Sequence, residues 1–125
     1  MIQKLVWLAF AGACGTLARY GLAGAVHRWL GGTYPWGTAA VNVVGCLLFG
    51  IVWAIGSERA TISPEARTII LVGFLGAFTT FSTFVSETNQ LFAEAELLIG
   101  FANVVLQLVA GSGGFFLGLA LGRLI

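Results

Sequence analysis

Four long apolar stretches limit what this chain can fold into. They cover about residues 4–26, 37–55, 68–91 and 97–121. Each is roughly 20 residues long, which is the length that a helix needs to cross the hydrocarbon core of a bilayer. Only 9% of the residues are charged, whereas a soluble domain carries about a quarter. We therefore predict an all-α membrane protein in which residues 1–125 form a single integral membrane domain with four transmembrane helices.

The orientation of these spans in the membrane is weakly specified. The first stretch superficially resembles a signal peptide, but apolar residues resume after Tyr20, which favours a retained span. Four spans place both termini on the same side. Positively charged residues are only slightly more frequent there than on the opposite side, so the bias leaves both topologies open. The charges on the side of the termini are Lys4, Arg59, Arg67 and Arg123, and Arg28 lies opposite.

Residues 73–84 interrupt the third stretch with an unusual pattern. They contain Gly73, Gly76, the adjacent pair Thr79 and Thr80, and several phenylalanines. Glycine and β-branched residues disfavour a continuous helix. Irregular backbone at membrane depth is tolerated only where protein or a water-filled path satisfies its polar groups. We therefore predict a break in the third transmembrane helix, and the break indicates an ion pathway.

A polar face on the second span is expected to meet this pattern. Thr38, Asn42 and Gly45 follow the i, i+4, i+7 spacing of one helix face. The Asn42 amide brings two donors and one acceptor group into the membrane. It can make an interhelical hydrogen bond, worth on the order of 0.6 kcal/mol, or contribute to an ion pathway. The neighbouring pattern at 73–84 favours the pathway.

Beyond the predicted break, polar and aromatic residues form neighbouring stripes. Thr80, Thr83 and Glu87 fall on one helix face, and Phe81 and Phe84 lie one turn apart beside them. An aromatic ring has a positive edge and a negative face. Ring edges therefore attract an anion weakly, whereas a cation would seek the ring face. The alternative is a stripe that only packs against protein or lipid, but the interleaved hydroxyl groups favour an anion pathway.

The remaining intramembrane polar residues have more than one interpretation. Glu87 can be an interfacial residue, or it can act as a gate, a proton-linked group or a brake on anion flux. Arg19 can form an anion-attracting vestibule or pair with backbone carbonyls. Asn103 and Gln107 share a face of the fourth span, and Ser112 lies on another side. We expect at least one of these last three to line a path, because polar groups inside membranes are usually functional.

These features resemble the Fluc (CrcB) family of small fluoride channels. The resemblance rests on residues 12–15 leading to Arg19, on residues 37–45, and above all on residues 73–84 with their Thr-Thr-Phe-Ser-Thr-Phe core. It implies passive, fluoride-selective export through the bacterial cell inner membrane. It also implies a dual-topology antiparallel homodimer with two pores near the interface.

The resemblance also implies roles for individual residues. Phe81 and Phe84 would contact fluoride edge-on, and Asn42 would donate hydrogen bonds to the ion. The backbone carbonyls of Gly76 and Thr79 would hold a structural sodium ion, Na+, at the dimer axis. Asn103 or Gln107 can take the place of Ser112 in the fourth span, and Arg19 would lie in the vestibule. The implied fluoride pore comprises Phe81, Phe84, Asn42, Thr38, Thr80, Ser82, Thr83, Ser112 and Glu87.

Two other classes of membrane protein are alternatives to a channel. A small four-helix drug or cation antiporter needs a titratable acid deep in the membrane. The first span has no carboxylate, and Glu87 lies near the end of its span, which counts against that class. A non-transporting assembly subunit would leave the polar pattern at 73–84 without a use. We do not expect an enzyme, because no nucleophile–base pair or metal cluster is apparent at membrane depth.

Overall fold

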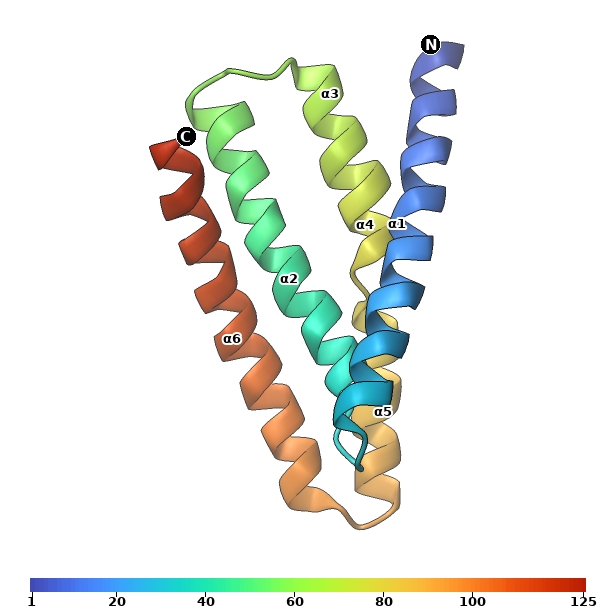
Figure 1. Cartoon of the computed structure of the whole chain (residues 1–125). Coiled ribbons are helices and arrows are strands. Elements are labelled where there is room, and N and C mark those ends of the chain that lie inside the picture. Colours follow the sequence, from blue (N-terminus) through green and yellow to red (C-terminus); the bar gives the residue numbers. More distant parts are fainter.

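The computed structural model describes all residues 1–125 as helices joined by short connections (Figure 1). Four helices are long and apolar enough to cross a membrane, which confirms the all-α, four-span prediction. Both termini lie at the same end of the molecule, at the top of Figure 1. The four spans are Ile2–Leu30, Trp36–Glu58, Pro64–Ala93 and Leu97–Leu124.

The first helix, α1 (Ile2–Leu30), extends past the apolar stretch predicted for it. Its last turn contains His27 and Arg28, which are polar but remain compatible with a helix. Apolar composition marks only the part of a helix that suits hydrocarbon, so it underestimates the length of the helix. The helix ends where Gly31 and Gly32 adopt φ values of 58° and 82°, a left-handed conformation that glycine tolerates best.

The second and fourth spans pack closely against each other. The second consists of α2 (Trp36–Trp53) and the π-helical segment η1 (Ala54–Glu58), and the fourth is α6 (Leu97–Leu124). Glycines bring the two backbones together: a Cβ atom on Gly118 would overlap the Leu47 carbonyl oxygen, and one on Gly50 would overlap the Phe115 carbonyl oxygen. The glycines spaced four residues apart on α6 all meet the α2 backbone in this way, so they serve helix packing within one chain. They are Gly114, Gly118 and Gly122.

The third span consists of consecutive helical segments. It begins with α3 (Pro64–Thr68), continues through the π-helical segment η2 (Ile69–Leu75) and the short α4 (Gly76–Phe78), and ends with α5 (Phe81–Ala93). The Ser63 side chain caps α3 by accepting a hydrogen bond from the Ala66 backbone N–H, at 3.1 Å. Helix α1 packs along η2 and α4. In Figure 1, α1 and α6 lie on opposite sides of α2.

Between α4 and α5, the backbone of Thr79 and Thr80 is extended. Thr79 has φ −83° and ψ 160°, and Thr80 has φ −149° and ψ 109°. The Thr80 side chain caps the N-terminus of α5, because its hydroxyl oxygen accepts a hydrogen bond from the Thr83 backbone N–H at 3.3 Å. Several backbone groups that a continuous helix would pair internally therefore need partners from other spans.

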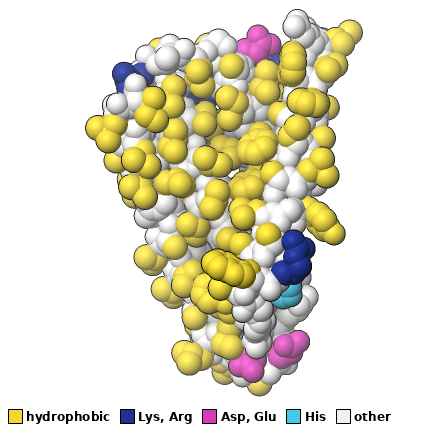
Figure 2. Space-filling view, in the orientation of Figure 1, with side chains coloured by type: hydrophobic (Ala, Val, Ile, Leu, Met, Phe, Trp, Pro, Cys, Tyr) yellow, Lys and Arg dark blue, Asp and Glu magenta, His cyan; other side chains and the backbone are white.

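The surface is apolar over most of its height. Figure 2 shows hydrophobic side chains across the middle of one face, with acidic side chains at the two ends. Only 22 of the 125 residues are buried, so the side chains that face outward must contact lipid or another protein. The small core between α2 and the third span includes Val41, Leu71, Leu75 and Phe78.

The α2–α6 contact leads to a stability prediction. Gly118→Ala would place a methyl group against the Leu47 carbonyl and separate the two helices. Overpacking of this kind costs about 1–3 kcal/mol, so we expect a lower thermal unfolding midpoint in detergent. Gly113→Ala is the matched control, because a Cβ at Gly113 has no neighbour within 4 Å. Equal midpoints for the two variants would contradict the close packing of α2 and α6.

Candidate ion pathway

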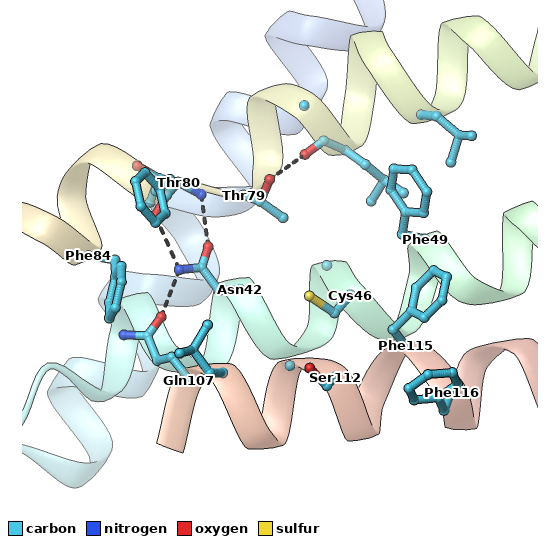
Figure 3. A pocket seen from close by; sticks show the side chains of 17 residues that line it. Asn42, Cys46, Phe49, Thr79, Thr80, Phe84, Gln107, Ser112, Phe115 and Phe116 are labelled. Carbon is cyan, nitrogen blue, oxygen red and sulfur yellow. Dashed lines mark hydrogen bonds between the residues drawn. The ribbon is translucent and has the colours of Figure 1, made fainter. Parts of the chain in front are cut away.

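Asn42 of α2 holds the extended backbone of Thr80. Its Oδ1 accepts a hydrogen bond from the Thr80 backbone N–H at 2.8 Å, and its Nδ2 donates to the Thr80 carbonyl oxygen at 3.1 Å. Nδ2 also donates to Gln107 Oε1 at 2.8 Å, as Figure 3 shows. An amide nitrogen carries two hydrogens, so neither N–H of Asn42 remains free for an anion in this arrangement.

The hydrogen bonds continue from Asn42 through buried residues of α6 and α5. Gln107 Nε2 donates to Asn103 Oδ1 at 2.8 Å, and Asn103 Nδ2 donates to Thr88 Oγ1 at 2.9 Å. The Thr88 hydroxyl in turn donates to the Phe84 carbonyl oxygen at 2.7 Å. Asn103 is fully buried, with 0% of its surface exposed. This polar chain, defined as Asn42, Gln107, Asn103 and Thr88, therefore links the two ends of the Thr80–Phe84 segment.

Phe81 and Phe84 lie next to this polar chain. Their ring centroids are 5.7 Å apart and the rings are tilted by 48°, between the stacked and the edge-to-face arrangement. Phe84 is buried, whereas 76% of the surface of Phe81 is exposed. One ring is therefore fixed within the chain, and the other lies at an open side of the molecule.

A cavity of about 570 Å³ contains both rings and is called here the phenylalanine cavity (Figure 3). No charged side chain lines it. Its walls combine hydroxyl and amide groups with aromatic rings, which suits an ion that must bind weakly enough to leave again. The polar side chains are Asn42, Thr79, Thr80, Gln107 and Ser112, and the rings are those of Phe49, Phe81, Phe84, Phe115 and Phe116.

A second cavity of about 630 Å³ is polar and charged, and is called here the arginine cavity. Arg19 and Arg28 line it from α1, and Glu87 lines it from α5. Thr80 lies in the walls of both cavities. The extended backbone around Thr80 therefore separates a charged compartment from an uncharged one.

The Glu87 carboxylate lines the arginine cavity and accepts a hydrogen bond from a neighbouring helix. The Thr38 hydroxyl donates to Glu87 Oε1 at 2.8 Å, while Oε2 is buried without a hydrogen-bond partner. The Tyr34 hydroxyl is also buried without a partner. Burial raises the pKa of Tyr34, and the nearby Glu87 carboxylate raises it further. The Tyr34 phenol therefore keeps its proton at neutral pH and can act as a donor.

The backbone carbonyls of Gly76 and Thr79 lack their usual helical donors. In a continuous helix they would accept from the N–H groups of Thr80 and Thr83, but those groups bind Asn42 Oδ1 and Thr80 Oγ1 instead. Gly76 and Thr79 both line the phenylalanine cavity. Carbonyls at the C-terminal end of an interrupted helix are typical sodium ligands in membrane proteins, so the Gly76 carbonyl, which lies in α4 just before the extended residues, fits the predicted site.

The Thr79 carbonyl is a less straightforward sodium ligand, because Arg19 Nη1 donates a hydrogen bond to it at 3.4 Å. A carbonyl oxygen has two lone pairs and can accept a second partner, but the guanidinium charge opposes a nearby cation. Arg19 therefore pairs with a backbone carbonyl, which is one of the two roles considered for it, and it also lines the arginine cavity. The anion-attracting vestibule stays a prediction.

Most of the polar residues selected from the sequence lie in one of these cavities. Thr38, Asn42 and Gly45 face α4 and α5 from one side of α2, as their spacing predicts. Ser82 differs: it is exposed, lies outside both cavities and approaches only the Thr80 hydroxyl, at 3.4 Å. The residues predicted for the fluoride pore that line the phenylalanine cavity are Asn42, Thr80, Phe81, Phe84 and Ser112. The residues predicted for the pore and vestibule that line the arginine cavity are Arg19, Thr38, Thr80, Thr83 and Glu87.

Thr88 is the polar residue that the sequence argument missed. It lies one helical turn after Phe84, and its hydroxyl bonds back to the Phe84 carbonyl. This bond is a common local arrangement of Thr in helices and alone gives no reason to select the residue. The useful signal would have been the shared burial of Thr88 with Asn103 on the facing helix, which requires the tertiary structure.

The fold and the two cavities define a small multi-pass membrane protein with a phenylalanine-lined cavity next to a charged one. Residues 6–119 match the family described as CrcB-like protein, Camphor Resistance (CrcB). The chain is 53% identical to the fluoride-specific ion channel FluC of Solidesulfovibrio magneticus over the full length of both proteins. The FluC proteins of Nitrosococcus oceani and Desulforapulum autotrophicum are each 47% identical, also over both full lengths. This chain belongs to the CrcB family.

The contacts of Asn42 lead to a test of its structural role. Asn42→Asp keeps the acceptor for the Thr80 N–H but replaces Nδ2 with a carboxylate oxygen that faces the Thr80 carbonyl and Gln107 Oε1. Loss of two partly buried hydrogen bonds costs at least about 1–3 kcal/mol, so we expect a lower unfolding midpoint near neutral pH. Gln90→Glu is the matched control, since Gln90 is exposed on α5 and lies outside both cavities. A midpoint for Asn42→Asp as high as that of the control would show that Asn42 does not hold Thr80.

Proposed function

We propose that this protein is a fluoride-specific ion channel that passively exports fluoride across the bacterial inner membrane and so relieves fluoride toxicity. The observation that carries the proposal is full-length similarity, at up to 53% identity, to proteins named fluoride-specific ion channel FluC. The phenylalanine cavity supports it, because its uncharged donors and ring edges suit a small anion. A channel of this kind catalyses no chemical reaction, which makes the protein a transporter and not an enzyme.

Selectivity follows from the hydration of the anion. Fluoride is small and holds water tightly, so donors at close range must replace that water as the ion enters a narrow path. Hydroxyl groups, an amide and the edges of Phe81 and Phe84 can do so without the strong binding that Lys or Arg would impose. The larger chloride ion would make poorer contacts with the same groups.

The charged residues would act at the entrance of the pathway. Arg19 lines the arginine cavity and can raise the local concentration of anions there. The Thr38 hydroxyl binds Glu87 in the same cavity, so Glu87 would influence anions before they reach Thr80 and Thr83. Asn42 would contribute mainly by holding Thr80, because direct donation to fluoride requires one of its two donated bonds to open.

Dual-topology antiparallel dimerisation is part of the proposal. Phe81 is largely exposed, and the exposed residues Gly76 and Ser112 also line the phenylalanine cavity. A second copy of the chain would cover this open side and exclude lipid from the ion path. The weak bias of positive charge permits the two opposite insertions that an antiparallel dimer needs.

A structural sodium ion at the dimer interface completes the proposal. The third helix would act as a broken helix at Thr79 and Thr80, and the carbonyls of Gly76 and Thr79 would bind the ion. The loss of their usual helical donors supports this assignment. When bound, sodium would supply positive charge that draws backbone carbonyls from the two chains together.

The role of the rings can be tested by flux measurements on purified protein in vesicles. We expect rapid fluoride efflux from the wild type with negligible chloride efflux, and no fluoride efflux from the double variant Phe81→Ile, Phe84→Ile. Aliphatic side chains keep the volume roughly but lack a positive ring edge. Phe10→Ile is the control, because Phe10 is exposed outside both cavities. Normal fluoride flux in the folded double variant would contradict a role for the rings.

The sodium site can be tested by replacing sodium with N-methylglucamine in detergent. We expect a lower unfolding midpoint and a shift from dimer towards monomer in light scattering, because a ligand that binds only the assembled state stabilises it. Restoring sodium should reverse both changes. The assignment would be wrong if mass and midpoint were the same in both cations, or if the protein were monomeric in sodium.

A further inference from the structure

The donor and acceptor atoms along the polar chain are fixed by its contact with the Thr80 backbone. A backbone N–H can only donate and a carbonyl can only accept, so the contacts of Thr80 with Asn42 place Oδ1 and Nδ2 without ambiguity. Asn42 Nδ2 then requires an acceptor from Gln107, which must present Oε1. The orientation of each amide in turn is set by the one before it.

The same logic holds from the opposite end. The Phe84 carbonyl can only accept, so the Thr88 hydroxyl must be the donor in the contact between them. The Thr88 oxygen then accepts from Asn103 Nδ2, which leaves Asn103 Oδ1 to accept from Gln107 Nε2. Both backbone ends therefore agree on one orientation for the Gln107 amide, with Oε1 towards Asn42 and Nε2 towards Asn103.

This orientation leaves one N–H of Gln107 without a partner. Nε2 carries two hydrogens, and only one of them is used, in the bond to Asn103. Gln107 lines the phenylalanine cavity together with Phe84, and Figure 3 shows the Gln107 amide beside that ring. In contrast, both N–H groups of Asn42 are already used.

We propose that Gln107 is the amide that donates a hydrogen bond to the anion in the phenylalanine cavity, and that Asn103 and Thr88 are positioning residues that hold its amide in the donating orientation. The inference rests on the proposed fluoride channel and deepens it by naming the donor. A reversed Gln107 amide would turn its oxygen towards Asn103 and present a second nitrogen to Asn42 Nδ2. It would break the chain at both neighbours, so the orientation is maintained cooperatively.

A fluoride titration followed by nuclear magnetic resonance tests the donor directly. The purified dimer carries ¹⁵N-labelled glutamine, and the Gln107 side-chain signal is assigned by its loss in Gln107→Leu. We expect this signal to shift with added sodium fluoride and to stay unchanged with equal sodium chloride. The Gln90 side-chain signal is the internal control, because Gln90 is exposed on α5. A Gln107 signal that ignores fluoride overturns the inference, whatever the flux.

The positioning residues are tested by flux and selectivity. Thr88→Val removes the hydroxyl but keeps the shape, so Asn103 loses its acceptor and Gln107 is held less firmly. One membrane hydrogen bond corresponds to roughly a threefold change in an equilibrium constant, and the strongest to about eighteenfold. We therefore expect fluoride flux to fall about threefold or more, with a smaller ratio of fluoride to chloride flux and a smaller fluoride-dependent shift of the Gln107 signal.

Three comparisons separate this inference from its alternatives. Thr88→Ser keeps the hydroxyl and should restore selectivity, which simple loss of packing would not explain. Thr88→Val with wild-type flux, selectivity and Gln107 response would overturn the positioning role. If the wild type bound fluoride at Gln107 but conducted none, the donor would stand and the proposed channel would fail, so the two claims have distinct outcomes.

Discussion

The pairing of Asn42 with the Thr80 backbone is the interaction on which the rest of the site depends. Hydrocarbon offers no partner to a free N–H or carbonyl group, so each unpaired group at membrane depth costs several kcal/mol. The extended residues Thr79 and Thr80 create such groups in the middle of the third span. Asn42 satisfies both polar groups of Thr80 with one side chain, much as a neighbouring strand would.

This pairing also determines what the surrounding groups can offer to an ion. Because Asn42 takes the Thr80 N–H, the carbonyl of Gly76, a residue that lines the phenylalanine cavity, loses its helical donor. Because Asn42 donates onward, the orientation of the Gln107 amide is set as well. One side chain thus leaves the Gly76 carbonyl without its helical donor and orients the Gln107 amide, and both residues line the phenylalanine cavity.

The sequence predicted the four helices well because long apolar stretches admit almost no other structure in a membrane. It also predicted which side of α2 would face the third span, since helical spacing alone places Thr38 and Asn42 together. It did not predict that the donors of Asn42 would be used within the protein, nor that Thr88 would take part. Those facts depend on which side chains from distant helices meet, and residue spacing within one helix does not contain them. The exposed position of Ser82 likewise depends on the direction in which α5 begins after the extended residues.

The most direct test of this account is the rate of amide hydrogen exchange at Thr80, measured by nuclear magnetic resonance on the purified protein. A donor held by Asn42 opens only when the packing between α2 and the third span opens. We predict that the Thr80 amide exchanges as slowly as the amide of Val41 in the core of α2, and that Asn42→Ala accelerates it strongly. Exchange at the rate of a free amide in the wild type would mean that Asn42 does not bind Thr80 in the membrane protein. The Thr80 backbone would then not fix the orientation of the Asn42 and Gln107 amides.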